Sequence, residues 1–294
     1  MPRVLPLRQF LVGAAVGSLV LAATAVAGAS STKGVYNAAD AKLVPATYRH
    51  TTLQVATDAT YPPDESMNGT TMVGFDINLI NAIATTLGIK VKENNVTFDN
   101  IIAGIKSGRY VIGNSSFTDE KSREKSVNFV DYFQAGEGIY ALSTSKVSFK
   151  GLPSLCGLTV AVETGTTEQS DANRQAGKCA PSKKLTVRTF ATQNEANTAV
   201  LSGQAQVGFV DSQVAGYIVS LSQGKFKLLG KAIEVAPYGI ATPKTPAGLG
   251  LAHAIDAALK TLVQNGTYGK ILSQYGVSAG ALPLSKMVLN GAIS

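Results

Sequence analysis

Four short polar segments of the chain carry side chains suited to a small zwitterion, a molecule with one positive and one negative end. Residues 113–118 offer hydroxyls and backbone groups that accept from an ammonium and donate to a carboxylate. Arg123 follows, and its planar guanidinium can hold a carboxylate through two charge-assisted hydrogen bonds. Thr166 and Thr167 stand at an expected helix N-terminus, where free amides and the helix dipole favour an anion. Asp211 ends an apolar run and suits an ammonium group.

Each of these segments also has a simpler interpretation. Serines and threonines after strands often form turns, and Arg123 lies within a charged run, residues 119–125, that can simply be solvated. Thr167 can be an ordinary helix cap, and Asp211 can cap the helix that follows it. The opposite charges fall in different halves of the chain, so the four segments taken together favour a binding site.

The elements that must position these residues follow an α/β pattern. From residue 51 onward, short β-branched runs alternate with helical patterns, which indicates α/β units around parallel strands. Helices are expected to begin at Asp76, at Asp99 and at a capping box formed by Thr192 and Glu195. In open α/β sheets, ligands bind where strands end. Strands are expected at residues 52–57, 90–96, 110–113, 158–162, 185–190 and 205–210.

The α/β pattern runs twice, which predicts two lobes. A chain of 294 residues is long enough for two medium domains. Two strand-like crossings between the lobes, near residues 141–146 and 233–238, would form a hinge. The expected division is a lead-in at residues 30–50, a first lobe at 51–143 and 237–276, a second lobe at 144–236, and a C-terminal tail at 277–294.

The N-terminus has the composition of an export signal. Arg3 and Arg8 precede a long uncharged, largely apolar stretch that ends in small residues, which predicts a cleaved signal peptide at residues 1–29. A permanent membrane anchor is the alternative, because about 20 apolar residues can span a bilayer. No later segment is long and apolar enough to span, so a periplasmic or extracellular location is expected.

The two cysteines, Cys156 and Cys179, are expected to form a disulfide, since an exported protein with an even cysteine count favours one. Closing a loop of this length would stabilise the fold by about 3 kcal/mol. A metal site is the competing interpretation, but His50 and His253 are isolated from the cysteines and from each other. The formal charge of +7 is scattered, without a basic run, so nucleic-acid binding is not indicated.

The chain resembles the amino-acid-binding receptors of ABC importers, solute-binding protein family 3, over residues 51–276. Matching stretches occur in family order and at family spacing: VATDATYPP, GFDINLINAIATTLG, FDNIIAGIKSGRY, SSFTDEKSREKSVNFVDYF, ETGTT, GQAQVGFVDSQVA and NGTYGKILSQYG. This resemblance implies a type II periplasmic-binding-protein fold, in which two α/β lobes close around a ligand and the first lobe is interrupted by the second.

The resemblance also implies ligand roles for particular residues. Arg123 and the backbone of Thr118, helped by Thr167, would hold the ligand carboxylate. Ser116, Thr118 and Asp211 would take the ammonium group. The complete expected ligand-binding set is Asp58, Tyr61, Phe98, Ser115, Ser116, Thr118, Arg123, Glu163, Thr166, Thr167 and Asp211, with Tyr61 and Phe98 covering the aliphatic part and Asp58 meeting the side-chain end.

The chain departs from the family pattern directly after Pro63, where Asp64 and Glu65 stand in place of the usual phenylalanine. Glu120 and Ser122 also fall at variable positions, which leaves that turn open. The acids at the expected cleft, Asp58, Asp64 and Glu163, favour a basic amino acid as ligand. A neutral polar ligand such as glutamine is the alternative, because Asp58 can equally accept from an amide.

A different class, a dehydratase of prephenate-like or arogenate-like acids on the same scaffold, is the alternative function, with Glu163 as general acid or base. The sequence contains neither a histidine–cysteine constellation, nor a G-x-S-x-G elbow, nor a phosphate loop beside it, so a non-enzyme is expected. A sensory module that presents ligand to a chemoreceptor shares the binding chemistry. The expected partners are a free amino acid and an ABC permease, with no cofactor or metal, and the protein is expected to be a monomer.

Overall fold

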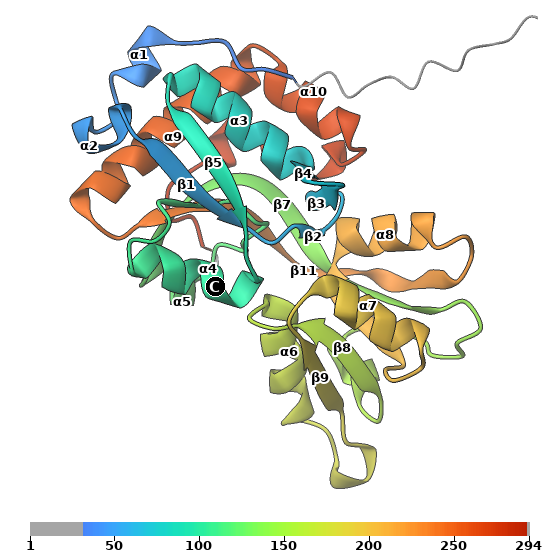
Figure 1. Cartoon of the computed structure of the whole chain (residues 1–294). Coiled ribbons are helices and arrows are strands. Elements are labelled where there is room, and N and C mark those ends of the chain that lie inside the picture. The colour runs from blue at the N-terminus through green and yellow to red at the C-terminus, as the bar shows by residue number, and fades with distance from the viewer. Residues whose placement is uncertain (1–31, 293–294) are drawn as a thin grey trace, which may run out of the picture. The chain divides into compact units, whose positions relative to one another are not determined.

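Residues 32–292, which the computed structural model describes, form two α/β lobes on one eight-stranded sheet (Figure 1). The strand order is β5-β1-β6-β11-β7-β10-β8-β9. The first three strands belong to the first lobe, the last three belong to the second, and β7 and β11 run through both. This is the expected two-lobed α/β fold. The signal segment proposed at residues 1–29 lies outside the described residues.

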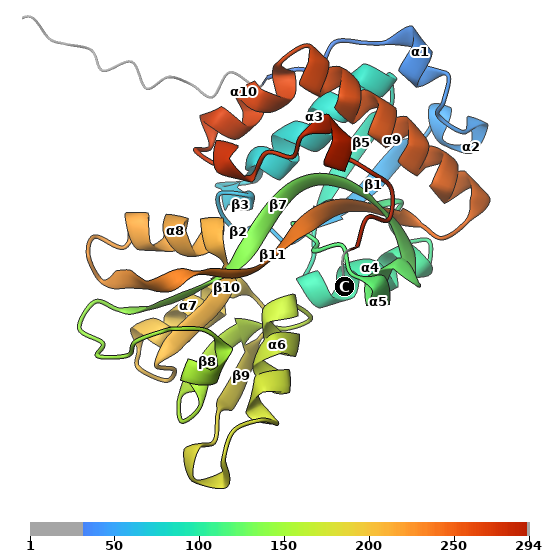
Figure 2. The ribbon, with the colours of Figure 1, turned by 180° about the vertical axis from the view of Figure 1, so that it is seen from behind.

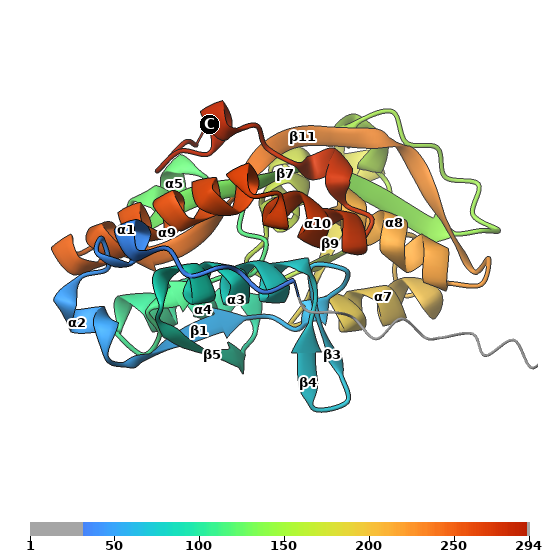
Figure 3. The same ribbon diagram turned by 90° about the horizontal axis from the view of Figure 1, so that it is seen from above.

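The first lobe contains three parallel strands, β1 (Thr52–Thr57), β5 (Lys90–Asn95) and β6 (Ile112–Gly113). Alternation along β1 sends Leu53 and Val55 to one face and Ala56 to the other. The first face packs on α3 (Phe75–Leu87), α9 (Pro246–Gln264) and α10 (Thr267–Gln274), and Figure 3 shows α3 and α9 along the strands. The second face packs on α4 (Phe98–Lys106).

The second lobe repeats this construction with parallel strands β8 (Thr159–Glu163), β9 (Thr186–Phe190) and β10 (Val207–Asp211). Val160 and Val162 pack on the face that carries α6 (Thr167–Ala176), while Ala161 packs on the face covered by α7 (Gln193–Leu201) and α8 (Ser212–Leu221). The start of α7 is the capping box formed by Thr192 and Glu195, as the sequence predicts.

Two long antiparallel strands, β7 (Val127–Leu142) and β11 (Phe226–Pro243), connect the lobes, and Figure 2 shows them side by side across the junction. Their ladder is interrupted between Leu229 and Gly239, which weakens the ribbon where bending is required. This interruption includes the crossing expected at residues 233–238. On the other strand, Glu137 already pairs with β10, so β7 enters the second lobe before residues 141–146. The lobe boundary after residue 143 stays a prediction.

Two helices start earlier than the sequence suggests. Gly74 and Thr97 occupy the N-cap positions of α3 and α4, so Asp76 and Asp99 lie inside the first turns instead of capping them. Asp76 is buried, and it accepts hydrogen bonds from the Ser116 amide at 3.0 Å and the Tyr132 hydroxyl at 2.8 Å. A tertiary partner therefore determines the side-chain position of Asp76, which local capping rules cannot anticipate.

Smaller elements complete the structure. The segment expected as an irregular lead-in contains α1 (Ala38–Ala41) and α2 (Ala46–Arg49), and α1 contacts α3 and α9. The C-terminal segment packs along β7, where Leu289 pairs with Val130 and Ala281 pairs with Phe133. The remaining elements are β2 (Thr60–Tyr61), β3 (Glu65–Asn68), β4 (Thr71–Val73), α5 (Lys121–Glu124) and 3-10 turns at Leu152–Leu155, Pro181–Lys183, Ser278–Gly280 and Leu284–Lys286.

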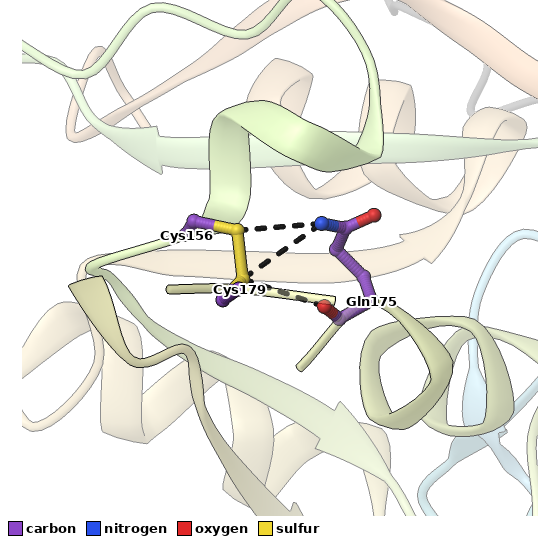
Figure 4. Close-up of a disulfide and its surroundings, with 3 residues drawn as sticks. All are labelled: Cys156, Gln175 and Cys179. Atoms are coloured by element: carbon purple, nitrogen blue, oxygen red, sulfur yellow. Dashed lines mark hydrogen bonds between the residues drawn. A yellow bond between two sulfur atoms is a disulfide. The ribbon is translucent and has the colours of Figure 1, made fainter. Parts of the chain in front are cut away.

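The predicted disulfide is present in the second lobe (Figure 4). Cys156, just before β8, is bonded to Cys179, just after α6, so the bridge closes the α6 side of the lobe. The side-chain amide of Gln175 donates to Cys156 Sγ at 3.3 Å. The disulfide replaces the metal-site interpretation of these two cysteines.

Candidate functional site

A small cavity lies between the lobes at the carboxyl ends of the parallel strands. The structure brings all eleven residues of the expected set to its wall. Two further residues, Glu65 and Glu168, line it and were not predicted. The lining residues are Asp58, Tyr61, Glu65, Phe98, Ser115, Ser116, Thr118, Arg123, Glu163, Thr166, Thr167, Glu168 and Asp211. Their roles toward a ligand remain predictions.

Arg123, on α5, bridges the two lobes. Its Nη1 donates to the Thr118 carbonyl at 2.9 Å in the first lobe, and its Nη2 donates to the Gly165 carbonyl at 3.0 Å in the second. The guanidinium lies over the rings of Phe98 and Phe117, 5.5 and 5.6 Å from their centroids. Burial lowers the pKa of Arg123, and the charge of Glu120 opposes that effect. Each terminal nitrogen of the guanidinium carries a second hydrogen, so Arg123 can still donate to an anion in the cavity.

Asp211, the last residue of β10, occupies the N-cap position of α8 but makes no capping hydrogen bond. Its Oδ2 instead accepts from the Tyr61 hydroxyl at 2.7 Å, and its backbone amide donates to the same hydroxyl at 3.1 Å. Burial raises the pKa of Asp211 to about 6, while hydrogen bonds from Tyr238 and Tyr61 and the charge of Arg123 oppose the rise. The capping interpretation of the side chain is therefore wrong, and Tyr61 turns its polar end toward an acid.

Asp58 follows β1, and its two oxygens are held by three donors. Oδ1 accepts from the Thr60 amide at 3.1 Å and the Thr60 hydroxyl at 2.7 Å, and Oδ2 accepts from the Phe98 amide at 2.9 Å. Burial raises the pKa of Asp58, and these hydrogen bonds limit the rise. These hydrogen bonds hold the Asp58 carboxyl in a fixed position at the cavity wall.

Thr166, Thr167 and Glu168 form the N-terminus of α6. The cap is Thr166, whose hydroxyl accepts from the Gln169 amide at 3.1 Å, and not Thr167. Thr167 Oγ1 lies 3.4 Å from Thr118 Oγ1 of the other lobe. Glu168 is 1% exposed, and its Oε1 has no hydrogen-bond partner among the described residues. An acid is common in the first turn of a helix because it interacts favourably with the helix dipole, so Glu168 does not stand out in the sequence.

Ser115 and Ser116, both in the expected ligand-binding set, are engaged with buried acids. Ser115 Oγ donates to Glu65 Oε1 at 2.8 Å, and Ser116 Oγ donates to Asp64 Oδ2 at 2.8 Å. The Asp64–Glu65 pair that departs from the family pattern therefore packs beneath these serines, next to Asp76. Burial raises the pKa values of Asp64 and Glu65 well above the ordinary carboxyl range, and the charge of Asp76 adds to the rise. The Ser115 hydroxyl also accepts from the Asp58 amide at 2.9 Å, so it has one lone pair left for a ligand donor, whereas the Ser116 hydroxyl keeps both.

The ionisable side chains of the cavity wall are mostly acidic. Five carboxyl side chains line it, and Arg123 is the one basic residue among the lining residues. Because a buried charge is costly without a partner, this wall favours a ligand that brings more than one positive group together with one negative group.

Comparison with known proteins identifies the family of this chain. The model of the bacterial extracellular solute-binding proteins, family 3, matches residues 53–278. The chain belongs to that family. It is 29% identical over 226 residues to the arginine-binding protein ArgT of Corynebacterium glutamicum, covering 76% of this chain and 73% of ArgT. It is 28% identical over 240 residues to the lysine/arginine/ornithine-binding periplasmic protein of Escherichia coli, covering 76% of this chain and 87% of the relative.

A solved structure of an ancestral arginine-binding protein bound to arginine superimposes on this family 3 protein with a TM-score of 0.72. The two are 32% identical, and the match covers 78% of this chain and 99% of the ancestral protein. The family 3 assignment thus rests on both sequence and fold. Within residues 32–292, no helix combines the length and apolar character needed to cross a membrane.

Proposed function

We propose that this protein is an extracytoplasmic receptor that closes its two lobes around a free basic amino acid and presents it to the permease of an ABC importer. The observation that carries the proposal is the excess of carboxyls on the cavity wall, five against one guanidinium. An amino acid with a cationic side chain has two positive groups and one negative group, which complements that wall.

The amino acid has a defined orientation in this proposal. Its carboxylate lies near Arg123 and the N-terminus of α6, where the guanidinium and free amides donate to it. Its ammonium lies at Asp211, and its side chain passes between Tyr61 and Phe98 toward Asp58. The relatives reported above, which bind arginine or the group lysine, arginine and ornithine, support the choice of a basic ligand.

Closure supplies the selectivity. Several contacts join the lobes around the cavity. Arg123 donates to the Gly165 carbonyl, and the Tyr61 hydroxyl donates to Asp211. The backbone amide of Gln193 donates to Thr60 Oγ1 at 3.3 Å, and the hydroxyls of Thr118 and Thr167 lie 3.4 Å apart. These contacts replace water around a bound ligand with fixed partners from both lobes. Closure is therefore favourable only when the ligand satisfies the charges that closing buries. The closed surface is what we propose the permease recognises.

The relatives are binding proteins, and no contact in the cavity specifically favours the dehydratase alternative. A calorimetric panel of arginine, lysine, ornithine, histidine, glutamine and glutamate tests the proposal. We expect the basic amino acids to bind more tightly than glutamine, and glutamate to bind weakest. Binding of acidic amino acids alone, or of none of the panel, would overturn the proposed function.

A further inference from the structure

The carboxyls of Asp58 and Glu163 approach each other from opposite lobes. Asp58 follows β1 of the first lobe, and Glu163 is the last residue of β8 in the second. Both line the cavity, and each is 2% exposed. Their side chains are close enough to share a hydrogen when one of them is protonated. Closing the lobes therefore presses two acids together inside the cavity.

The two acids differ in how well they are satisfied. Asp58 receives three donated hydrogen bonds, from the amide and hydroxyl of Thr60 and from the Phe98 amide. Glu163 Oε1 has no hydrogen-bond partner among residues 32–292, although it is buried and lies at the cavity wall. A buried carboxylate oxygen without a donor is costly, so Glu163 is the member of the pair that needs a positive partner.

The other charged groups around Glu163 do not provide that partner. Glu168 on α6 and Asp99 on α4 face it, and both are acidic like Asp58. The guanidinium of Arg123 is directed to the Gly165 and Thr118 carbonyls. Neighbouring strand β9 carries Arg188, which lies over the Phe190 ring and donates to the Gln204 carbonyl.

We propose that Glu163 is a specificity-determining residue, because the cross-lobe Asp58–Glu163 pair opposes closure on any amino acid whose side chain lacks a positive end. A cation on the ligand neutralises the pair directly. With a neutral ligand, the pair must take up a proton instead. This inference rests on the proposed function. The proposed function explains how basic amino acids are bound, and the Asp58–Glu163 pair explains how neutral amino acids are rejected.

The inference predicts different pH dependences for charged and neutral ligands. With the lobes apart, both carboxyls are solvated and ionised at neutral pH. Closure on arginine then needs no proton, while closure on a neutral ligand takes up one, which Glu163 holds because Asp58 is already fixed by its donors. The closed neutral complex binds more protons than the open form, so its affinity should rise about tenfold for each unit that the pH falls. The affinity for arginine should stay nearly constant.

Citrulline is a suitable probe, because it has the length of arginine but ends in an uncharged urea group. We would measure the affinities for arginine and citrulline by calorimetry from pH 5 to pH 8, in buffers with different ionisation enthalpies to count protons. In the wild type, citrulline binding should take up about one proton near neutral pH and strengthen as the pH falls. Arginine binding should show neither effect.

Glu163→Gln keeps the shape of the side chain and removes its charge. This variant should bind citrulline at least about tenfold more tightly than the wild type at pH 8, lose the pH dependence, and lower the arginine-to-citrulline affinity ratio. Asp99→Asn is the matched control, since it removes an exposed acid that faces Glu163 from outside the cavity wall. It should leave the affinity ratio unchanged.

The outcomes separate this inference from the proposed function. A wild type that binds none of the amino acids overturns both. A wild type that binds arginine, but whose citrulline affinity does not vary with pH, overturns the role of Glu163 and leaves the function standing. An unchanged arginine-to-citrulline affinity ratio in Glu163→Gln would also overturn the role of Glu163 and leave the function standing. If that variant does not fold, proton uptake by the wild type decides the question alone.

Discussion

At the scale of single residues, the site depends on charged side chains that their neighbours hold in fixed positions. Arg123 is fixed by two backbone carbonyls and two aromatic rings, and Asp211 is fixed by Tyr61. In this closed arrangement both side chains are held in fixed positions. The same rigidity makes the two residues hard to replace.

Arg123→Ala and Asp211→Ala should each remove most of the ligand affinity. Truncating one partner of a buried, hydrogen-bonded charge pair costs about 2–5 kcal/mol, so we expect an affinity loss of at least about 30-fold for arginine by calorimetry. Arg109→Ala is the control, because it removes a guanidinium that stacks on Tyr110 away from the cavity. Unchanged binding in either cavity variant would refute this site.

At the scale of elements, the site is built where parallel strands end and helices begin. Four cavity residues lie at the ends of parallel strands: Asp58 after β1, Ser115 after β6, Glu163 at the end of β8 and Asp211 at the end of β10. The sheet order places these strand ends on both sides of the β7–β11 ribbon. The turn between β8 and α6 lies against the start of α4 in the first lobe. A Cβ at Gly165, whose φ is +85°, would lie 3.1 Å from the Asp99 Cβ and 3.2 Å from the Asp99 Cα.

Gly165→Val should therefore obstruct closure without removing a charge. We expect weaker arginine binding and a smaller ligand-induced decrease in the radius of gyration, measured by calorimetry and small-angle X-ray scattering. Gly203→Val controls for backbone strain, because Gly203 has a similar φ of +74° in the same lobe but no neighbouring atom within 4 Å of an added Cβ. If both variants close and bind like the wild type, the contact between this turn and α4 does not limit closure.

At the scale of the whole molecule, buried acids link stability to pH. Asp64, Glu65 and Asp76 are completely buried together in the first lobe, around Ser116. Burial raises the pKa of Asp76 to about 6 and those of Asp64 and Glu65 well above the ordinary range. The folded state thus holds protons that the unfolded chain releases near pH 4. Stability from this cluster is present at low pH and is lost as the pH rises through 6 and beyond.

The unfolding temperature of the ligand-free protein should therefore be higher near pH 5 than at pH 8. Asp64→Asn should raise the unfolding temperature at pH 8 and flatten its dependence on pH, because an amide removes one buried negative charge while its carbonyl oxygen can still accept from Ser116 and Gln213. Calorimetric scans over this pH range test both statements. A midpoint that rises from pH 5 to pH 8 in the wild type would contradict them.

Most of the residues that line the cavity could be predicted from the sequence alone. Hydrophobic periodicity and turn residues place Asp58, Ser115, Glu163 and Asp211 at strand ends, and a parallel sheet gathers strand ends at one edge. The disulfide was likewise predictable from the expected export signal and the even cysteine count. These features follow from local patterns, which fix the element that a residue belongs to and its position along that element.

The tertiary structure alone decided which side chains meet. Only the folded chain shows that Asp76 bonds to Ser116 and Tyr132 instead of capping its helix, and that Glu168 reaches the cavity. It also shows that Asp58 meets Glu163 across the two lobes. The physical reason is that such contacts join segments far apart in the sequence. Their geometry depends on how helices pack on the sheet and how the β7–β11 ribbon brings the lobes together, and neither leaves a local signal in the order of the residues.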